Sequence, residues 1–269
     1  MLLLSAWACT SITDPPLDPR AVPVQPLSVY ARWWSMVESC SGLQGSLSEV
    51  SWYEVPGSET VEYPGDEASA YWSAASSRIV LAGKVTLSGV VVRHEMLHAL
   101  LRNVKGHPRE YFLERCGGLV SCTTSCIRDA GPGPNIDPAT ERVTSNVLKL
   151  FVSIVPDAPS SSVDGGVFTV IVAATNPNSH AIVITPSATA FNHGFFYTLF
   201  LDSGGGIGGS VDVLDPGMRY FAPGETKRQY FDFSIGPNFG DHVVPPGSYR
   251  VNAGYETRGV ALEGVAIGP

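Results

Sequence analysis

The chain has 269 residues, 44% of them hydrophobic, which is enough to bury a substantial core and to form two domains. Its 17 basic and 25 acidic residues give a formal net charge of -8 and a pI near 5.2. Because lysine and arginine cluster nowhere, the composition argues against a nucleic-acid-binding protein.

The first residues resemble the end of a secretory signal. The stretch MLLLSAWAC is short and apolar, and the chain turns polar and proline-rich directly after Cys9. Ala8 before Cys9 resembles a bacterial lipoprotein cleavage site, which would place a lipid on Cys9; a disordered tail is the alternative. A basic n-region is absent, so the true start can lie upstream of Met1. We expect an exported protein, lipid-anchored in the cell envelope or extracellular, with residues 1–26 as signal remnant and proline-rich tether.

Residues 27–127 are predicted to form a compact α+β domain. In PLSVYARWWSMVESC the aromatic residues recur at helical spacing, which predicts an amphipathic helix. Residues 49–55 and 77–83 are predicted strands, with a third possible near TVEYPG and an ambiguous stretch at YWSAASS. Together these elements predict a helix followed by a small sheet.

Two further helices are predicted after this sheet. Ser88 or Thr86 is expected to cap a helix that runs to about Asn103, where Lys105 and Gly106 supply C-terminal signals. HPREYFLERC begins another short helix, with Pro108 suited to its first turn.

Four cysteines remain once Cys9 is set aside. In an exported chain an even number of cysteines indicates disulfides, and three pairings of Cys40, Cys116, Cys122 and Cys126 are possible. We favour a bridge from Cys40 to the 116–126 group. A zinc knuckle is the rival interpretation, but the spacing C-x5-C-x3-C lacks its paired C-x2-C.

Residues 128–139 contain RDAGPGPNIDP, which has no hydrophobic pattern and is the best linker candidate. Beyond it, residues 140–269 hold short β-branched and aromatic runs separated by turn signals such as NPNS and APGE. This spacing predicts an antiparallel β-sandwich. The stretch SGGGIGG at 203–209 is interpreted as a flexible loop because it lacks the Lys-Ser/Thr of a phosphate-binding loop.

The residues that point most directly to chemistry lie in RHEMLHALLRNVKGHP, at 93–108. His94 and His98 stand four residues apart, so on a helix both imidazoles lie on one face, as a tetrahedral zinc ion requires. Zinc lowers the pKa of a bound water to about 7 and polarises a carbonyl group. Glu95, beside the first histidine, is placed to act as general base rather than as a ligand.

A third protein ligand is expected, with the fourth position left open for water. His107 is our choice, because Gly106 can adopt the positive φ that lets the chain reverse after the helix. Glu110 and Glu114 are the competing ligands. His180, His193 and His242 lie in or near predicted loops and are not expected to bind metal.

VVVRHEMLHALL, preceded by a helix and strands, resembles the active-site helix of the zincin metallopeptidases, and GHPREYF resembles the following segment of small SprT-like zincins. The resemblance covers roughly residues 27–127 and implies zinc ligation by His94 and His98 with Glu95 as base. His107 follows His98 by nine residues, which is longer than that family's usual spacing. The second half resembles bacterial Ig-like sandwich domains only in general pattern.

These features predict an exported bacterial zinc metalloprotease: a minimal zincin-like domain followed by a β-sandwich, acting on peptide or protein substrates as a monomer. One rival is a binding lipoprotein that contains zinc without catalysing hydrolysis. The other is a structural surface protein whose sandwich carries the function.

Overall fold

The computed structural model describes residues 14–63, 66–102, 104, 106–186 and 193–269. The lipidation candidate Cys9 and most of the signal remnant therefore lie outside the described residues. The chain combines helices with a sheet-rich part, as an α+β composition requires. In the described part, no helix has both the length and the apolar character needed to cross a bilayer.

The first half is built on a four-stranded sheet with the order β1-β2-β6-β5. β2 and β6 run parallel, whereas β1 and β5 are antiparallel to their neighbours. The strands are β1 (Val22–Pro23), β2 (Ser51–Val55), β5 (Ala70–Ser73) and β6 (Arg78–Ala82). A separate hairpin joins β3 (Val61–Tyr63) to β4 (Asp66–Ala68).

Two helices cover this sheet, α1 (Ser28–Ser41) and α2 (Gly89–Leu101). α1 forms because Tyr30, Trp33 and Trp34 recur on one helical face, and that face is buried with residues of α2 such as Met96. Gly42, with φ 74°, ends the helix in the left-handed conformation that glycine adopts without strain. α2 is buried on most sides, so side chains along it are fixed by packing.

After α2 the chain forms a π-helix, η3 (Glu110–Arg115), and a short helix, α3 (Thr124–Asp129). Two disulfides hold this region: Cys40 of α1 is bonded to Cys116, and Cys122 to Cys126. The bridge from Cys40 to the later group is the pairing favoured from the sequence.

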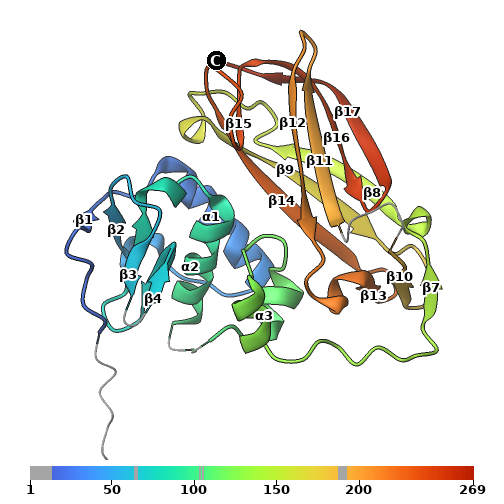
Figure 1. Cartoon of the computed structure of the whole chain (residues 1–269), viewed down its shortest axis with the longest axis horizontal. Helices are drawn as coiled ribbons and strands as arrows, with labels where there is room; N and C mark the ends of the chain where they lie inside the picture. The colour runs from blue at the N-terminus through green and yellow to red at the C-terminus, as the bar shows by residue number, and fades with distance from the viewer. Residues whose placement is uncertain (1–13, 64–65, 103, 105, 187–192) are drawn as a thin grey trace, which may run out of the picture.

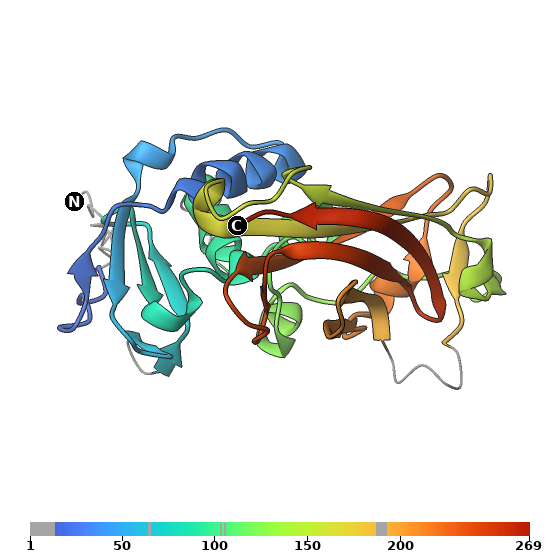
Figure 2. The ribbon, with the colours of Figure 1, turned by 90° about the horizontal axis from the view of Figure 1, so that it is seen from above.

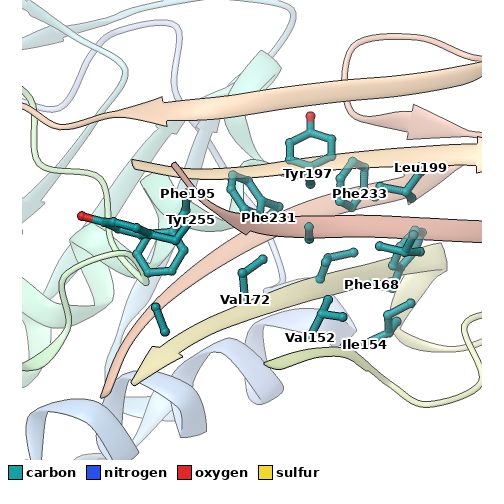
Figure 3. Packing of buried hydrophobic residues seen from close by; sticks show 14 of the residues in the cluster. Val152, Ile154, Phe168, Val172, Phe195, Tyr197, Leu199, Phe231, Phe233 and Tyr255 are labelled. Atoms are coloured by element: carbon teal, nitrogen blue, oxygen red, sulfur yellow. The ribbon is translucent and has the colours of Figure 1, made fainter. Parts of the chain in front are cut away.

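The second half contains two four-stranded sheets, ordered β12-β11-β16-β17 and β15-β14-β9-β8, and a three-stranded sheet ordered β13-β10-β7. The two larger sheets share one hydrophobic core, in which Phe168 stacks on Phe233 and Tyr197 packs against Phe231 and Phe233 (Figure 3). The strands are β7 (Glu141–Val143), β8 (Lys149–Val155), β9 (Val167–Thr175), β10 (Ile182–Ile184), β11 (His193–Leu201), β12 (Gly206–Asp212), β13 (Tyr220–Phe221), β14 (Thr226–Ile235), β15 (Val243–Val244), β16 (Gly247–Tyr255) and β17 (Arg258–Ile267). Short 3₁₀ turns, η1 (Leu47–Glu49), η2 (Gly83–Val85), η4 (Ser145–Val147), η5 (Asp164–Gly166) and η6 (Pro216–Arg219), connect elements in both halves.

The two halves, which lie side by side in Figure 1, are joined by a buried ion pair. Arg93 of α2 is fully buried and donates two hydrogen bonds, of 3.0 and 2.7 Å, to the carboxylate of Asp232 on β14. Thr169 of β9 donates to the same carboxylate, at 2.7 Å. Gly89 lies where a Cβ atom would collide with both members of the pair, so glycine is required for this close approach.

A second attachment joins α1 to the sheets. Arg32 donates hydrogen bonds to the carbonyl oxygens of Val155 and Val167, and pairs with Asp164 at 3.1 Å. Figure 2 shows α1 beside the turn that precedes β9. The second half is therefore fixed to two helices of the first.

Two expectations about the first half are wrong, and a third, the N-cap at Ser88, is confirmed in position alone. Residues 14–26 are not a free tether, because β1 pairs with β2 and the buried Asp18 accepts a hydrogen bond from the Glu62 backbone. Ser88 stands at the N-cap of α2, but its side chain makes no capping hydrogen bond. α3 continues to Asp129, two residues into the predicted linker.

In the second half, the loop predicted at 203–209 is wrong from Gly206 onward, where β12 begins. β12 pairs with β11, and a Cβ on Gly208 or Gly209 would lie 2.7 or 2.8 Å from the side chain of Thr198 or Tyr197. The glycines therefore allow β12 to lie close to the side chains of β11. Because glycine is rare in strands, its propensity predicts a loop here rather than a strand.

We expect Asp232→Ala to lower the free energy of unfolding by about 3–5 kcal/mol, because it leaves the Arg93 charge buried without a partner. Denaturant unfolding followed by circular dichroism measures this loss. Asp241→Ala removes a fully exposed carboxylate and serves as the control, with a change below about 0.5 kcal/mol. Equal effects of the two substitutions would show that the buried pair does not hold the halves together.

Candidate metal centre

Three histidine side chains converge at the C-terminal half of α2. The Nε2 atom of His94 lies 3.2 Å from the Nε2 of His98 and 3.2 Å from that of His107. These are the histidines singled out from the sequence, and their ligand atoms all lie within 4.8 Å of one another. The helical spacing of four residues aligns the first two, and the chain reversal after α2 brings in the third.

The reversal after α2 depends on two residues with positive φ. Arg102 ends the helix with φ 55°, and Gly106 has φ 71°. At Gly106 a Cβ atom would lie 2.6 Å from the Asp129 carboxylate, so glycine supplies both the conformation and the space. His107 follows immediately and points back to α2.

Asp129 of α3 fixes the orientation of His107. Its Oδ2 atom accepts hydrogen bonds from the His107 backbone N–H, at 2.8 Å, and from His107 Nδ1, at 2.9 Å. These bonds hold the pKa of the Asp129 carboxyl below its usual value. With Nδ1 engaged, the Nε2 atom of His107 is left to serve as a ligand.

His94 is oriented in the same way by a backbone group. Its Nδ1 atom lies 2.5 Å from the carbonyl oxygen of Ser121, so Nδ1 carries the proton and Nε2 the lone pair. Burial lowers the pKa of His94 to about 4 and that of His98 to about 2. Both imidazoles are therefore neutral at pH 7, which is the form that binds a metal.

Phe112 of η3 supports all three imidazoles from one side. Its ring centroid lies 4.9 Å from that of His94 and 4.8 Å from those of His98 and His107. Because Phe112 is fully buried, it excludes water from this side of the histidines and restricts their rotation.

Glu95 lies on the same helix, directly after His94, and its carboxyl is within hydrogen-bonding reach of the backbone of Trp72 in the sheet. Its side chain is buried, and burial raises the pKa of its carboxyl to about 8. A hydrogen bond from the Trp72 backbone, on the edge strand β5, opposes this rise. Glu95 of α2 is thus placed beside β5, the last strand of this sheet among the described residues.

The competing ligands are engaged elsewhere. Glu110 pairs with Arg115 at 2.7 Å, and Glu114 pairs with Arg109 at 3.4 Å. In the second half His180 pairs with Glu141, and His242 contacts the backbone carbonyl of Asp232. Within the described residues, His94, His98 and His107 form the one group arranged to hold a metal ion.

Sequence reasoning missed the groups that orient the histidines. Ser121 orients His94 through its backbone carbonyl group. Every residue has such a group, so the residue type at position 121 does not indicate this role. Asp129 lies at the start of the segment predicted to be a linker. The spacing of four residues between Cys122 and Cys126 is the one sequence feature that is consistent with the helix α3, which contains Asp129.

No family model and no curated protein matches this chain. An alkylpurine DNA glycosylase from Pseudomonas fluorescens, AlkC, solved on DNA with an abasic site analog, is 10% identical with a TM-score of 0.29. The match covers 44% of this chain and 30% of the glycosylase. The ApaA protein from Bordetella pertussis is 19% identical with a TM-score of 0.22, over 48% of this chain and 98% of that protein. Likenesses this weak carry no argument about fold or function, so the site is interpreted from its own residues.

The three imidazoles fit a zinc ion by the chemistry of their donor atoms. Zinc is commonly bound by neutral imidazole nitrogen, and catalytic sites use three protein ligands with one open position. Here three Nε2 atoms converge, and two of the rings are held through Nδ1 by a carbonyl or a carboxylate, the arrangement typical of metal-binding histidines.

We expect Asp129→Ala to weaken zinc binding about 10- to 100-fold, because His107 loses the carboxylate that orients its ring. Competition with a chromophoric zinc chelator measures the affinity. Asp157→Ala removes an exposed aspartate outside the site and is the matched control. Unchanged zinc affinity in Asp129→Ala would mean that His107 needs no such support or is not a ligand.

Proposed function

We propose that this protein is a zinc-dependent metallopeptidase that hydrolyses peptide bonds. The observation that carries the proposal is the convergence of the Nε2 atoms of His94, His98 and His107 on a helix that also presents Glu95. His94, His98 and His107 would hold the metal. When bound, zinc supplies a Lewis acid that activates water and polarises the carbonyl of the scissile bond.

Glu95 is the proposed general base. It accepts a proton from the attacking water and transfers it to the leaving amine. Its buried position keeps the pKa of the carboxyl near the working pH, about 8 before any metal binds, and a pKa in this range suits a group that must both take and release a proton.

The edge strand β5 supports a peptide as substrate. β5 is the last strand of its sheet, and the Trp72 backbone is directed to Glu95 rather than to a further strand. An extended peptide can add to such an edge through main-chain hydrogen bonds. This binding mode would place the peptide backbone beside Glu95.

We include the division of the chain into two domains in the same proposal. Residues 27–127 would form a minimal zincin-like catalytic domain, and residues 140–269 an Ig-like sandwich. We further propose that the protein is exported and monomeric, with a lipid on Cys9 as the route to membrane attachment. The two disulfides support the proposed export, because disulfides form and persist in oxidising compartments.

The second candidate is a zinc-containing binding protein without hydrolytic activity. Burial of Glu95 favours it, because only 7% of this residue is exposed, which restricts the access of water and substrate to its carboxyl group. The two candidates share the metal and differ in turnover.

We expect Glu95→Gln to lower peptide hydrolysis by at least about 10²- to 10⁴-fold while zinc stays bound at wild-type affinity, because the residue acts on water and is not a ligand. A broad peptide-cleavage screen with metal analysis of the same samples measures both. His98→Ala should instead lose the metal and the activity together.

Glu110→Gln is the matched control, since Glu110 pairs with Arg115 and lies outside the histidine cluster. It should keep both metal and turnover. Wild-type protein that contains zinc but cleaves no peptide in the screen would contradict the peptidase and favour the binding protein.

A further inference from the structure

A large cavity lies between the two halves, beside the candidate metal centre. Its volume is about 610 Å³, within the range of small-molecule sites. One wall is formed by η3 and residues 117–127 of the first half, and the other by β14 and η6 of the second. Phe112 and Ser121 line the cavity and also contact His94, but the three histidines do not line it.

Contacts between the halves fix the spacing of these walls. On one side, the carbonyl oxygen of Gly118 accepts hydrogen bonds from the Tyr230 backbone N–H, at 3.2 Å, and from the Gln229 side chain, at 3.0 Å. On the other, Arg109 forms an ion pair with the buried Asp215. Because the walls are bonded to one another at both places, the cavity is preformed, and ordering of the site costs a ligand little free energy.

The lining of the cavity is largely apolar. It includes apolar side chains from both halves: Leu113, Val120, Ile127, Phe195, Leu214 and Met218. Leu214 is 54% exposed, and Leu113 and Met218 are partly exposed, so apolar lining is in contact with water. A ligand with an apolar body would remove that surface from water, and this favours its binding.

The charged groups of the lining favour a neutral ligand. Among the described residues, the lining holds four carboxylates and three cations: Glu114, Asp212, Asp215, Glu225, Arg109, Lys227 and Arg228. Arg109 pairs with Asp215 and Glu114, and Lys227 pairs with Glu225 at 2.9 Å. The other two, Asp212 and Arg228, are exposed, so water solvates their charges.

An ionic ligand would therefore enter this cavity at a cost. An anion would meet a lining with one negative charge in excess. A cation would have to compete with Arg109 or Lys227 for a carboxylate that is already paired. In both cases the charge of the ligand gives up water without gaining a free partner of opposite sign inside the cavity, a cost that a neutral molecule avoids.

We propose that this cavity binds a neutral small molecule with an apolar body, which contacts Leu113 of the first half and Leu214 of the second. Binding comes from apolar surface that is removed from water, and it requires no ionic group on the ligand. The site does not depend on the metal or on hydrolytic activity, so it can be tested in protein that holds no zinc.

Fluorescence titration of the full chain with the neutral apolar dye N-phenylnaphthylamine tests the proposal, because the dye becomes strongly fluorescent in apolar surroundings. It should bind at one site per chain, with the same affinity in the presence and absence of EDTA, since the histidines do not line the cavity. Absence of saturable binding, or binding that EDTA abolishes, would overturn the proposal.

Three competitors with the same apolar body test the requirement for a neutral ligand. Decanol is neutral, decanoate is an anion, and decylammonium is a cation. Decanol should displace the dye at a concentration at least about tenfold lower than either ion, because a charge must give up water to enter the cavity. Displacement by either ion at the same concentration as decanol, or at a lower one, would contradict the proposal.

Two exposed leucines locate the bound dye. Leu214→Asp places a carboxylate in the lining and should weaken binding of the dye and of decanol more than about fivefold, because less apolar surface is removed from water. Leu87→Asp makes the same change at a residue that is 44% exposed and does not line the cavity, and it should change neither affinity.

Leu113→Trp fills the cavity and should weaken both ligands as well, with thermal unfolding as the check that this variant is folded. If it is not, Leu214→Asp, at an exposed position, decides alone. Wild-type affinity for the dye in Leu214→Asp would show that the dye binds elsewhere and would refute the site. Binding to phosphatidylcholine vesicles without binding of the free dye would refute it too, since the occupant would then be a lipid surface.

Discussion

The buried pair of Arg93 and Asp232 is the interaction on which the rest of the structure depends. Arg93 precedes the first histidine of the candidate metal centre by one residue, and its guanidinium also donates to the Leu119 carbonyl at 2.8 Å and lies 5.5 Å from the Trp33 ring. One side chain thus connects α2, α1, the segment after η3 and the β14 strand. A charge buried this deeply tolerates little displacement, because each lost hydrogen bond leaves part of it unsolvated.

The segment from Cys116 to Asp129 connects this buried pair to the candidate metal centre. Disulfides fix Cys116 to α1 and Cys122 to Cys126, and Gly118 is hydrogen-bonded to β14. Between and beyond these attachments lie the Ser121 carbonyl, which orients His94, and Asp129, which orients His107. The imidazoles are therefore positioned by a segment that the second half of the chain helps to hold.

The sequence allowed α1, α2, several of the strands and the convergence of the three histidines to be predicted, because these follow from local rules. Helical spacing places His94 and His98 on one face, and Gly106 permits the reversal that returns His107. The sequence does not predict β12, because its glycines are needed for close packing against Thr198 and Tyr197 of the neighbouring strand. Strand propensity takes no account of such neighbours. Ser121, Asp129 and the Arg93–Asp232 pair were missed because they join residues 22 to 139 positions apart or act through the backbone.

Deleting residues 140–269 is consequently a poor way to ask which half carries the activity. The deletion removes Asp232 and leaves the fully buried Arg93 without its partner, one residue from His94. It also removes Gln229 and Tyr230, which hold the segment that orients His94 through Ser121. Loss of activity after such a deletion would therefore follow equally from a catalytic first half and from a functional second half. Only substitutions that leave this frame intact, such as Glu95→Gln, separate the two roles.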